Sequence, residues 1–243
     1  MRSIYLKEIN SFFSSLIAYL VIGGFLALLG LLLWIFPDDN ILEAKFASLD
    51  SLFNVAPLVL MFLIPAITMR SFAEENQTGT IELLVTKPVA DWQIILAKFL
   101  ACLTLVIIAI LPTLVYYVSV YLLGSPVGNL DTGAIMGSYI GLVFLGACFV
   151  SIGIFASSLT KNQIVAFIIA TFLCFLIHWG FSYTSRIPVF VGRFDDLIQL
   201  LGIDFHYGSI SRGLVDSRDV VYFFSITGFF LFLTLLMVER RKW

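Results

Sequence analysis

The side chains best suited to chemistry in this sequence form a group near its end, where Asp204, His206, Asp216 and Asp219 follow one another closely. Histidine and aspartate are common zinc ligands, but zinc sites require characteristic spacings between their ligands. These four residues match no standard spacing, so we predict no metal site. We expect Asp216 and Asp219 to form ion pairs with Arg212 and Arg218 at the membrane surface.

The other histidine, His178, lies in an apolar stretch at four-residue spacing from Ala166, Ala170 and Cys174. Residues spaced in this way share one face of a helix, so we expect this face to pack against a neighbouring helix. A histidine inside a membrane can relay protons or bind a metal. No apolar stretch holds a carboxylate that could partner it, so we favour a hydrogen-bonded packing role and keep the relay as the alternative.

The motifs that would make this chain an enzyme are absent from the sequence. It has no Gly-x-x-x-x-Gly-Lys-Ser/Thr phosphate loop and no nucleophile elbow. The cysteines, Cys102, Cys148 and Cys174, all lie in apolar stretches and are predicted to be small packing residues rather than a disulfide framework. We therefore predict no catalytic residue, cofactor or metal in this chain, and any energy for transport must come from another protein.

The composition is that of a polytopic membrane protein. Of the 243 residues, 60% are hydrophobic and only 12% are charged, and the mean hydropathy is +1.02. A soluble globular domain is about half apolar and a quarter charged. The longest basic run is Arg240-Arg241-Lys242, so nothing predicts a nucleic-acid partner.

Six uncharged stretches are long enough to cross a membrane, which takes about 20 residues of helix. A charge at the bilayer centre costs about 2.5–3.5 kcal/mol, so the lack of charge in all of them supports this interpretation. The sequence predicts an all-α fold in which residues 1–243 form one transmembrane domain. The predicted spans are residues 12–36, 51–69, 99–123, 133–158, 163–183 and 220–238.

The basic residues predict that both termini and residues 70–98 are cytoplasmic, because an even number of spans puts them on one side and cytoplasmic segments are rich in Lys and Arg. Residues 1–11 are amphipathic and predict a helix lying in the membrane interface, with an extension of the first span as the alternative. Residues 184–219 are outside and apolar enough to predict a partly re-entrant segment. The basic residues assigned to the cytoplasmic side are Arg2, Lys7, Arg70, Lys87, Lys98, Lys161, Arg240, Arg241 and Lys242.

Two spans carry residues that affect how helices pack. Gly133, Gly137 and Gly141 form a small-xxx-small stripe, which lets two helix backbones approach closely in a membrane. Pro57 and Pro65 each remove a backbone donor from the second span and favour a kink. Such kinks can serve static packing or gating, and we favour static packing.

The segment 70–98 is polar except for an apolar centre at Ile81, Leu83, Leu84 and Val85. Gly79 should interrupt the regular secondary structure. Thr80 is predicted to cap a short helix that ends before Lys87-Pro88. Such a short loop has no core of its own for these side chains. Either a cytoplasmic partner docks on them, or they turn back into lipid.

This segment resembles the loop after the second span in permease subunits of type-2 ABC transporters. The resemblance rests on Phe72-Ala73-Glu74-Glu75, Gly79-Thr80-Ile81-Glu82-Leu83-Leu84-Val85-Thr86-Lys87-Pro88, Asp91-Trp92 and Ala97-Lys98-Phe99. The closest subgroup is similar to the gliding-motility-associated ABC permease of Bacteroidetes bacteria. The segments that resemble this subgroup are residues 204–216 and 219–223.

The resemblance implies a permease in the bacterial inner membrane, driven by a separate ATPase subunit that binds the ATP and magnesium. It implies a second permease subunit, identical or paralogous, export as the direction of transport, and a role in gliding motility. The alternatives are a structural anchor that recruits partners without transport, and an intramembrane enzyme or ion-coupled carrier. The residues implied in contact with the ATPase are Glu74, Glu75, Gly79, Thr80, Ile81, Glu82, Leu83, Leu84, Val85, Thr86 and Pro88.

Overall fold

The computed structural model describes residues 1–37, 40–42, 46–80, 90–188, 192 and 194–240, and every element in these ranges is helical. The all-helical prediction is therefore confirmed. The elements are α1 (Arg2–Phe13), α2 (Leu16–Trp34), α3 (Asp50–Thr68), α4 (Arg70–Thr78), α6 (Asp91–Ile110), η2 (Leu111–Thr113), α7 (Leu114–Leu123), α8 (Thr132–Leu159), α9 (Gln163–Phe175), η3 (Leu176–Gly180), α10 (Phe181–Ser185), α11 (Asp195–Gln199), α12 (Ile203–Ile210) and α13 (Ser217–Arg240).

Five segments of the described residues are long and apolar enough to cross a membrane. A sixth would be the bent pair formed by Arg2–Phe13 and Ala18–Trp34, whose axes differ by 70°. That angle makes α1 a separate helix rather than a straight extension of the first span. The five segments are Asp50–Thr78, Asp91–Leu123, Thr132–Leu159, Gln163–Ser185 and Ser217–Arg240.

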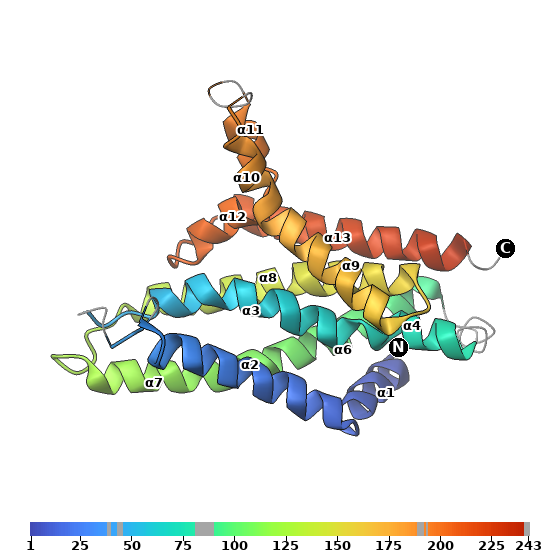
Figure 1. Cartoon of the computed structure of the whole chain (residues 1–243), viewed down its shortest axis with the longest axis horizontal. Coiled ribbons are helices and arrows are strands. Elements are labelled where there is room, and N and C mark those ends of the chain that lie inside the picture. The colour runs from blue at the N-terminus through green and yellow to red at the C-terminus, as the bar shows by residue number, and fades with distance from the viewer. Residues whose placement is uncertain (38–39, 43–45, 81–89, 189–191, 193, 241–243) are drawn as a thin grey trace.

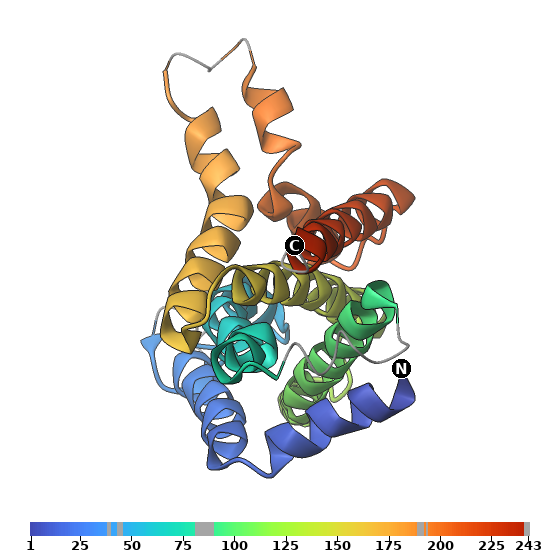
Figure 2. The ribbon, with the colours of Figure 1, turned by 90° about the vertical axis from the view of Figure 1, so that its right-hand side faces the viewer.

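The long helix α8 lies at the centre of the bundle and packs against α13, α9, α3 and α6 (Figure 1). The chain termini lie toward the end of the bundle where α4 also lies (Figure 1). Seen from that end, α1 lies across the axes of the neighbouring spans (Figure 2). This is the orientation expected of a helix in the membrane interface.

Proline 57 is accommodated in α3 by a partner from a distant part of the chain. A proline lacks the N–H that would serve the carbonyl four residues before it, here that of Phe53. The hydroxyl of Tyr207 on α12 donates to this carbonyl oxygen at 2.9 Å, and Tyr207 is buried. Helix α12 is thereby fixed to α3.

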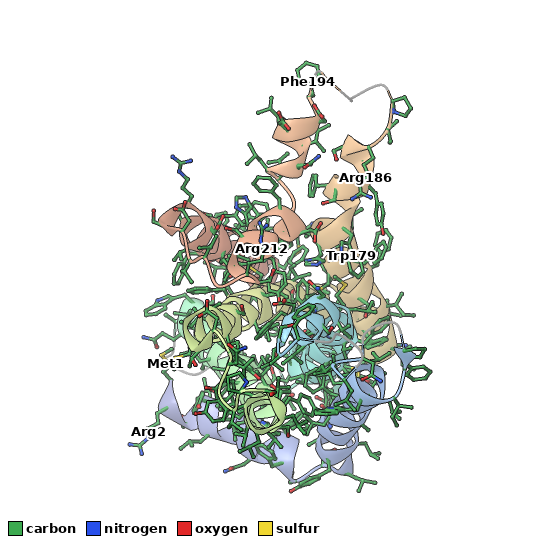
Figure 3. The ribbon with its side chains drawn as sticks, turned by 90° about the vertical axis from the view of Figure 1, so that its left-hand side faces the viewer. Met1, Arg2, Trp179, Arg186, Phe194 and Arg212 are labelled. Carbon is green, nitrogen blue, oxygen red and sulfur yellow. The ribbon has the colours of Figure 1, made fainter. Side chains whose placement is uncertain are left out.

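The hairpin of α10 and α11 stands away from the rest of the bundle. Its two helices pack on each other, and α10 also contacts η3 (Figure 1). Arg186 lies along one arm of the hairpin and Phe194 near its tip (Figure 3). Phe194 and Leu197 are exposed there, as are several other apolar side chains.

The third span is longer than the sequence predicts. The prediction begins at residue 99, whereas α6 begins at Asp91, and the segment continues through η2 and α7 to Leu123. Ala90 takes the N-cap position of α6. Lys98 makes the prediction begin too late, because an unpaired cation is costly in a membrane helix.

Candidate functional site at the junction of α1, α4 and α6

The break between α3 and α4 is filled by a serine from α8. The hydroxyl of Ser157 donates to the carbonyl of Met69 at 2.9 Å and accepts from the amide N–H groups of Phe72 and Ala73 at 3.0 Å each. In an unbroken helix the N–H of Ala73 would bond the carbonyl of Met69. A side chain inserted into this ladder interrupts it, so Ser157 marks the point where the span becomes α4.

Four charged residues from three helices meet beside this break. We call Lys7 and Glu8 of α1, Glu75 of α4 and Lys98 of α6 the Lys98 cluster. Lys7 Nζ lies 3.0 Å from Glu75 Oε1, and Lys98 Nζ lies 2.9 Å from Glu8 Oε1. Two ammonium groups and two carboxylates give the cluster no net charge.

Lys98 is the buried centre of this cluster, with 1% of its side chain exposed. An ammonium has three protons to donate. Lys98 Nζ donates to Glu8 Oε1 at 2.9 Å and to the carbonyl of Ser71 at 2.7 Å. It also lies 3.0 Å from Glu75 Oε2, an ion-pair distance at which the groups are not aligned as a hydrogen bond. The ring of Phe72 is 5.0 Å from the same nitrogen.

The outer members of the site extend this network toward solvent. Partial burial acts to lower the pKa of Lys7, but its hydrogen bond to Glu75 and the attraction of the nearby carboxylates outweigh burial and raise that pKa above its ordinary value. Arg70 Nε binds Glu74 Oε2 at 3.0 Å, one turn along α4. Lys7 therefore remains charged at neutral pH.

The residues that the sequence implies in ATPase contact fall into two groups. Glu75 is buried in the Lys98 cluster and so faces the protein interior, while Glu74 is partly exposed. Gly79 ends α4 with φ of +72°, a left-handed conformation that favours glycine. This agrees with the interruption that the sequence predicts at Gly79. Thr80 Oγ1 lies 2.9 Å from Thr78 Oγ1 in the following turn.

The remaining residues of that group lie outside the described residues. The predicted coupling helix falls in this part of the chain and stays a prediction. These residues are Ile81, Glu82, Leu83, Leu84, Val85, Thr86 and Pro88.

The glycine stripe of α8 faces α12 and the turn after it. A Cβ placed on Gly137 would lie 2.7 Å from the carbonyl oxygen of Gly213, and one on Gly141 would overlap the side chain of Ile210. Gly133 has more room, with only the Asp131 carboxylate at 3.4 Å. Two of the three stripe residues thus lie at a close contact within this chain.

The face of α9 predicted to pack does lie inward. Ala166, Ala170 and Cys174 are fully buried, on a helix that contacts α8 and α3. His178 follows on the π-helical turn η3 and is buried against the rings of Phe149 and Trp179.

A carboxylate does approach His178, from outside the apolar stretches. Asp204 Oδ1 lies 4.0 Å from His178 Nε2, and Asp204 Oδ2 accepts a 3.0 Å hydrogen bond from Ser182. The other ring nitrogen, His178 Nδ1, has no hydrogen-bond partner among the described residues. His178 is therefore packed in the interior as expected. Its contact with Asp204, at 4.0 Å, is too long to be the expected hydrogen bond.

The charged residues near the end of the chain pair differently from the prediction. Asp219 is buried and lies 2.7 Å from His206 Nδ1, while His206 Nε2 lies 3.0 Å from the carbonyl of Leu200. Arg212 donates to the carbonyl of Gly208 at 2.9 Å rather than to an aspartate. Asp219 lies in the first turn of α13, packed against α12, which brings it to His206 instead of an arginine.

The fold and the site together define a multi-pass helical membrane protein with a polar junction where α1, α4 and the start of α6 meet. A family model described as "ABC-2 family transporter protein" matches residues 4–186, which is most of the chain. The chain therefore belongs to the ABC-2 family of transporter proteins, and it is a permease subunit of an ABC transporter. Comparison with curated proteins gives no significant match.

Proposed function

We propose that this permease couples ATP hydrolysis by a separate ATPase subunit to transport, through residues 79–90. The observation that supports this most directly is the tie between α4 and α6, the helices on either side of that loop. Lys98 of α6 contacts both Glu75 and the carbonyl of Ser71 on α4. A force applied to the loop would therefore reach two membrane-length segments, Asp50–Thr78 and Asp91–Leu123, together.

In this proposal the ATP and magnesium bind to the partner ATPase, and this chain supplies the membrane path. The apolar residues Leu83 and Leu84 would bind in a groove on that ATPase. A second permease, identical or paralogous, would complete the path, and both termini would be cytoplasmic in the bacterial inner membrane.

The finer assignment is to an exporter associated with gliding motility. It rests on the resemblance of residues 204–216 and 219–223 to that subgroup of permeases. In the structure these residues form α12, the following turn and the start of α13. They lie where α12 meets α3 and α13, and His206, Tyr207 and Asp219 make buried contacts there.

The test is co-purification of the ATPase with permease variants. Leu83→Asp/Leu84→Asp should insert in the membrane as the wild type does and lose the ATPase, because charged side chains would not enter an apolar groove. A matched control is Leu214→Asp/Val215→Asp, which makes the same kind of change at two exposed residues near the opposite end.

Full retention of the ATPase by the loop variant would contradict the proposed docking site. If the ATPase binds the wild type but ATP turnover in the reconstituted complex is indifferent to loop substitutions, the chain is a structural anchor instead.

A further inference from the structure

The Lys98 cluster has a connection that the proposed coupling does not require. Its members come from the two helices that flank the loop and also from the N-terminal helix α1. If force enters at residues 79–90, as the proposed function holds, α1 is attached to the point of entry although it is remote from it in sequence.

We propose that Lys98 is a positioning residue that makes α1, α4 and the start of α6 move as one body. It holds a carboxylate from α1, a carboxylate from α4 and a backbone carbonyl of α4 around one buried nitrogen. Lys7 adds a second bridge from α1 to Glu75.

Burial gives this joint its stiffness. Exposed ion pairs are weak because solvent competes for both partners, whereas a buried pair that loses one partner leaves an unpaired charge. Lys98 cannot release Glu8 without leaving its own proton unbonded in the interior. A displacement of α4 is therefore passed to α1 rather than absorbed by a sliding contact.

This inference gives α1 a function of its own. An amphipathic helix at the interface could serve only as an anchor, in which case it would stay with the lipid while α4 moves. Through Lys98 it would instead carry the motion along the membrane surface.

The experiment measures distances between spin labels in the complex of permease and ATPase in lipid nanodiscs. One pair, Ser3→Cys with Gln77→Cys, spans α1 and α4 at exposed positions. The other pair, Gln77→Cys with Val127→Cys, relates α4 to the segment between α7 and α8 at the opposite end of the bundle (Figure 1). Each pair is measured without nucleotide and with ATP, magnesium and vanadate.

In the wild type, nucleotide trapping should shift the Gln77–Val127 distance and leave the Ser3–Gln77 distance unchanged. In Lys98→Met the Gln77–Val127 shift should remain, while the Ser3–Gln77 distance should also shift and its distribution broaden. Lys161→Met is the matched control, since Lys161 is an exposed lysine between α8 and α9, and it should behave as the wild type.

A second variant separates positioning from folding. Glu8→Gln/Glu75→Gln/Lys98→Met removes the carboxylates that Lys98→Met would leave buried with too few partners. It should recover the yield of folded complex and still show the Ser3–Gln77 shift, because methionine forms no bridge and the remaining contact from Lys7 is largely exposed and therefore weak. A role in folding alone would predict wild-type distances in this variant.

Two results would overturn the inference while leaving the proposed function standing. The first is a Ser3–Gln77 distance that changes on nucleotide trapping in the wild type. The second is a Ser3–Gln77 distance that stays the same on trapping in both Lys98 variants. A Gln77–Val127 distance that ignores ATP in the wild type, or an ATPase that does not co-purify, would overturn the proposed function and this inference together.

Discussion

The hydroxyl of Tyr207 donates a 2.9 Å hydrogen bond to the carbonyl of Phe53, the group that Pro57 cannot serve. Tyr207→Phe should lower the free energy of unfolding by about 1–3 kcal/mol, because it leaves a buried carbonyl without a partner. In a Pro57→Ala background the same change should cost less, since the amide of residue 57 can then bond Phe53. Thermal unfolding in detergent of the four members of this double-mutant cycle checks the prediction. Equal losses in both backgrounds would contradict it.

Ser157 and Ser158 are adjacent serines with different partners, which makes them a matched pair. Ser157 bonds three backbone groups at the break between α3 and α4, whereas Ser158 bonds the carbonyl of Phe155 in its own helix at 2.7 Å. Ser157→Ala should reduce stability by about 1–3 kcal/mol, and Ser158→Ala should have little effect. The measurement is the thermal midpoint of each variant under one set of detergent conditions. A Ser158→Ala loss as large as that of Ser157→Ala would show that the α3–α4 break does not depend on Ser157.

The glycines of α8 should differ in their tolerance of alanine. Gly141→Ala should cost about 1–3 kcal/mol because its methyl would overlap Ile210, whose branched side chain is stiff. Gly133→Ala should be neutral or slightly stabilising, since its nearest atom lies at 3.4 Å and alanine favours a helix. Adding Ile210→Ala should reduce the cost of Gly141→Ala. Thermal stability of the single and double variants tests this, and an Ile210→Ala that gives no relief would place the overlap elsewhere.

Sequence patterns predicted the apolar spans well because each depends only on consecutive residues. Absence of charge over about 20 residues is a local property, and α8 and α13 begin and end close to the predicted bounds. The start of α6 was misjudged for the same reason. Lys98 looks like the edge of a span until Glu8 and Glu75 are seen beside it.

The candidate site depends on partners that are far apart in sequence. The resemblance implies an ATPase contact for Glu75, which stays a prediction, whereas its position 3.0 Å from Lys98 could not be foreseen from sequence. Ser157 gives no sequence signal, because many membrane helices contain serine and its role depends on α8 crossing the α3–α4 break. Two-residue patterns could have suggested Arg70 with Glu74, which are one helical turn apart.

The pairing of Glu8 with Lys98 also sets an order of events during synthesis. The two residues are 90 positions apart, and a ribosome adds about 5–20 residues per second, so α1 emerges roughly 5–20 s before its buried partner. During that interval Glu8 has no lysine from α6 to meet, and the amphipathic helix can only wait on the membrane surface. Helix α1 is therefore seated against α6 only after Lys98 has been synthesised.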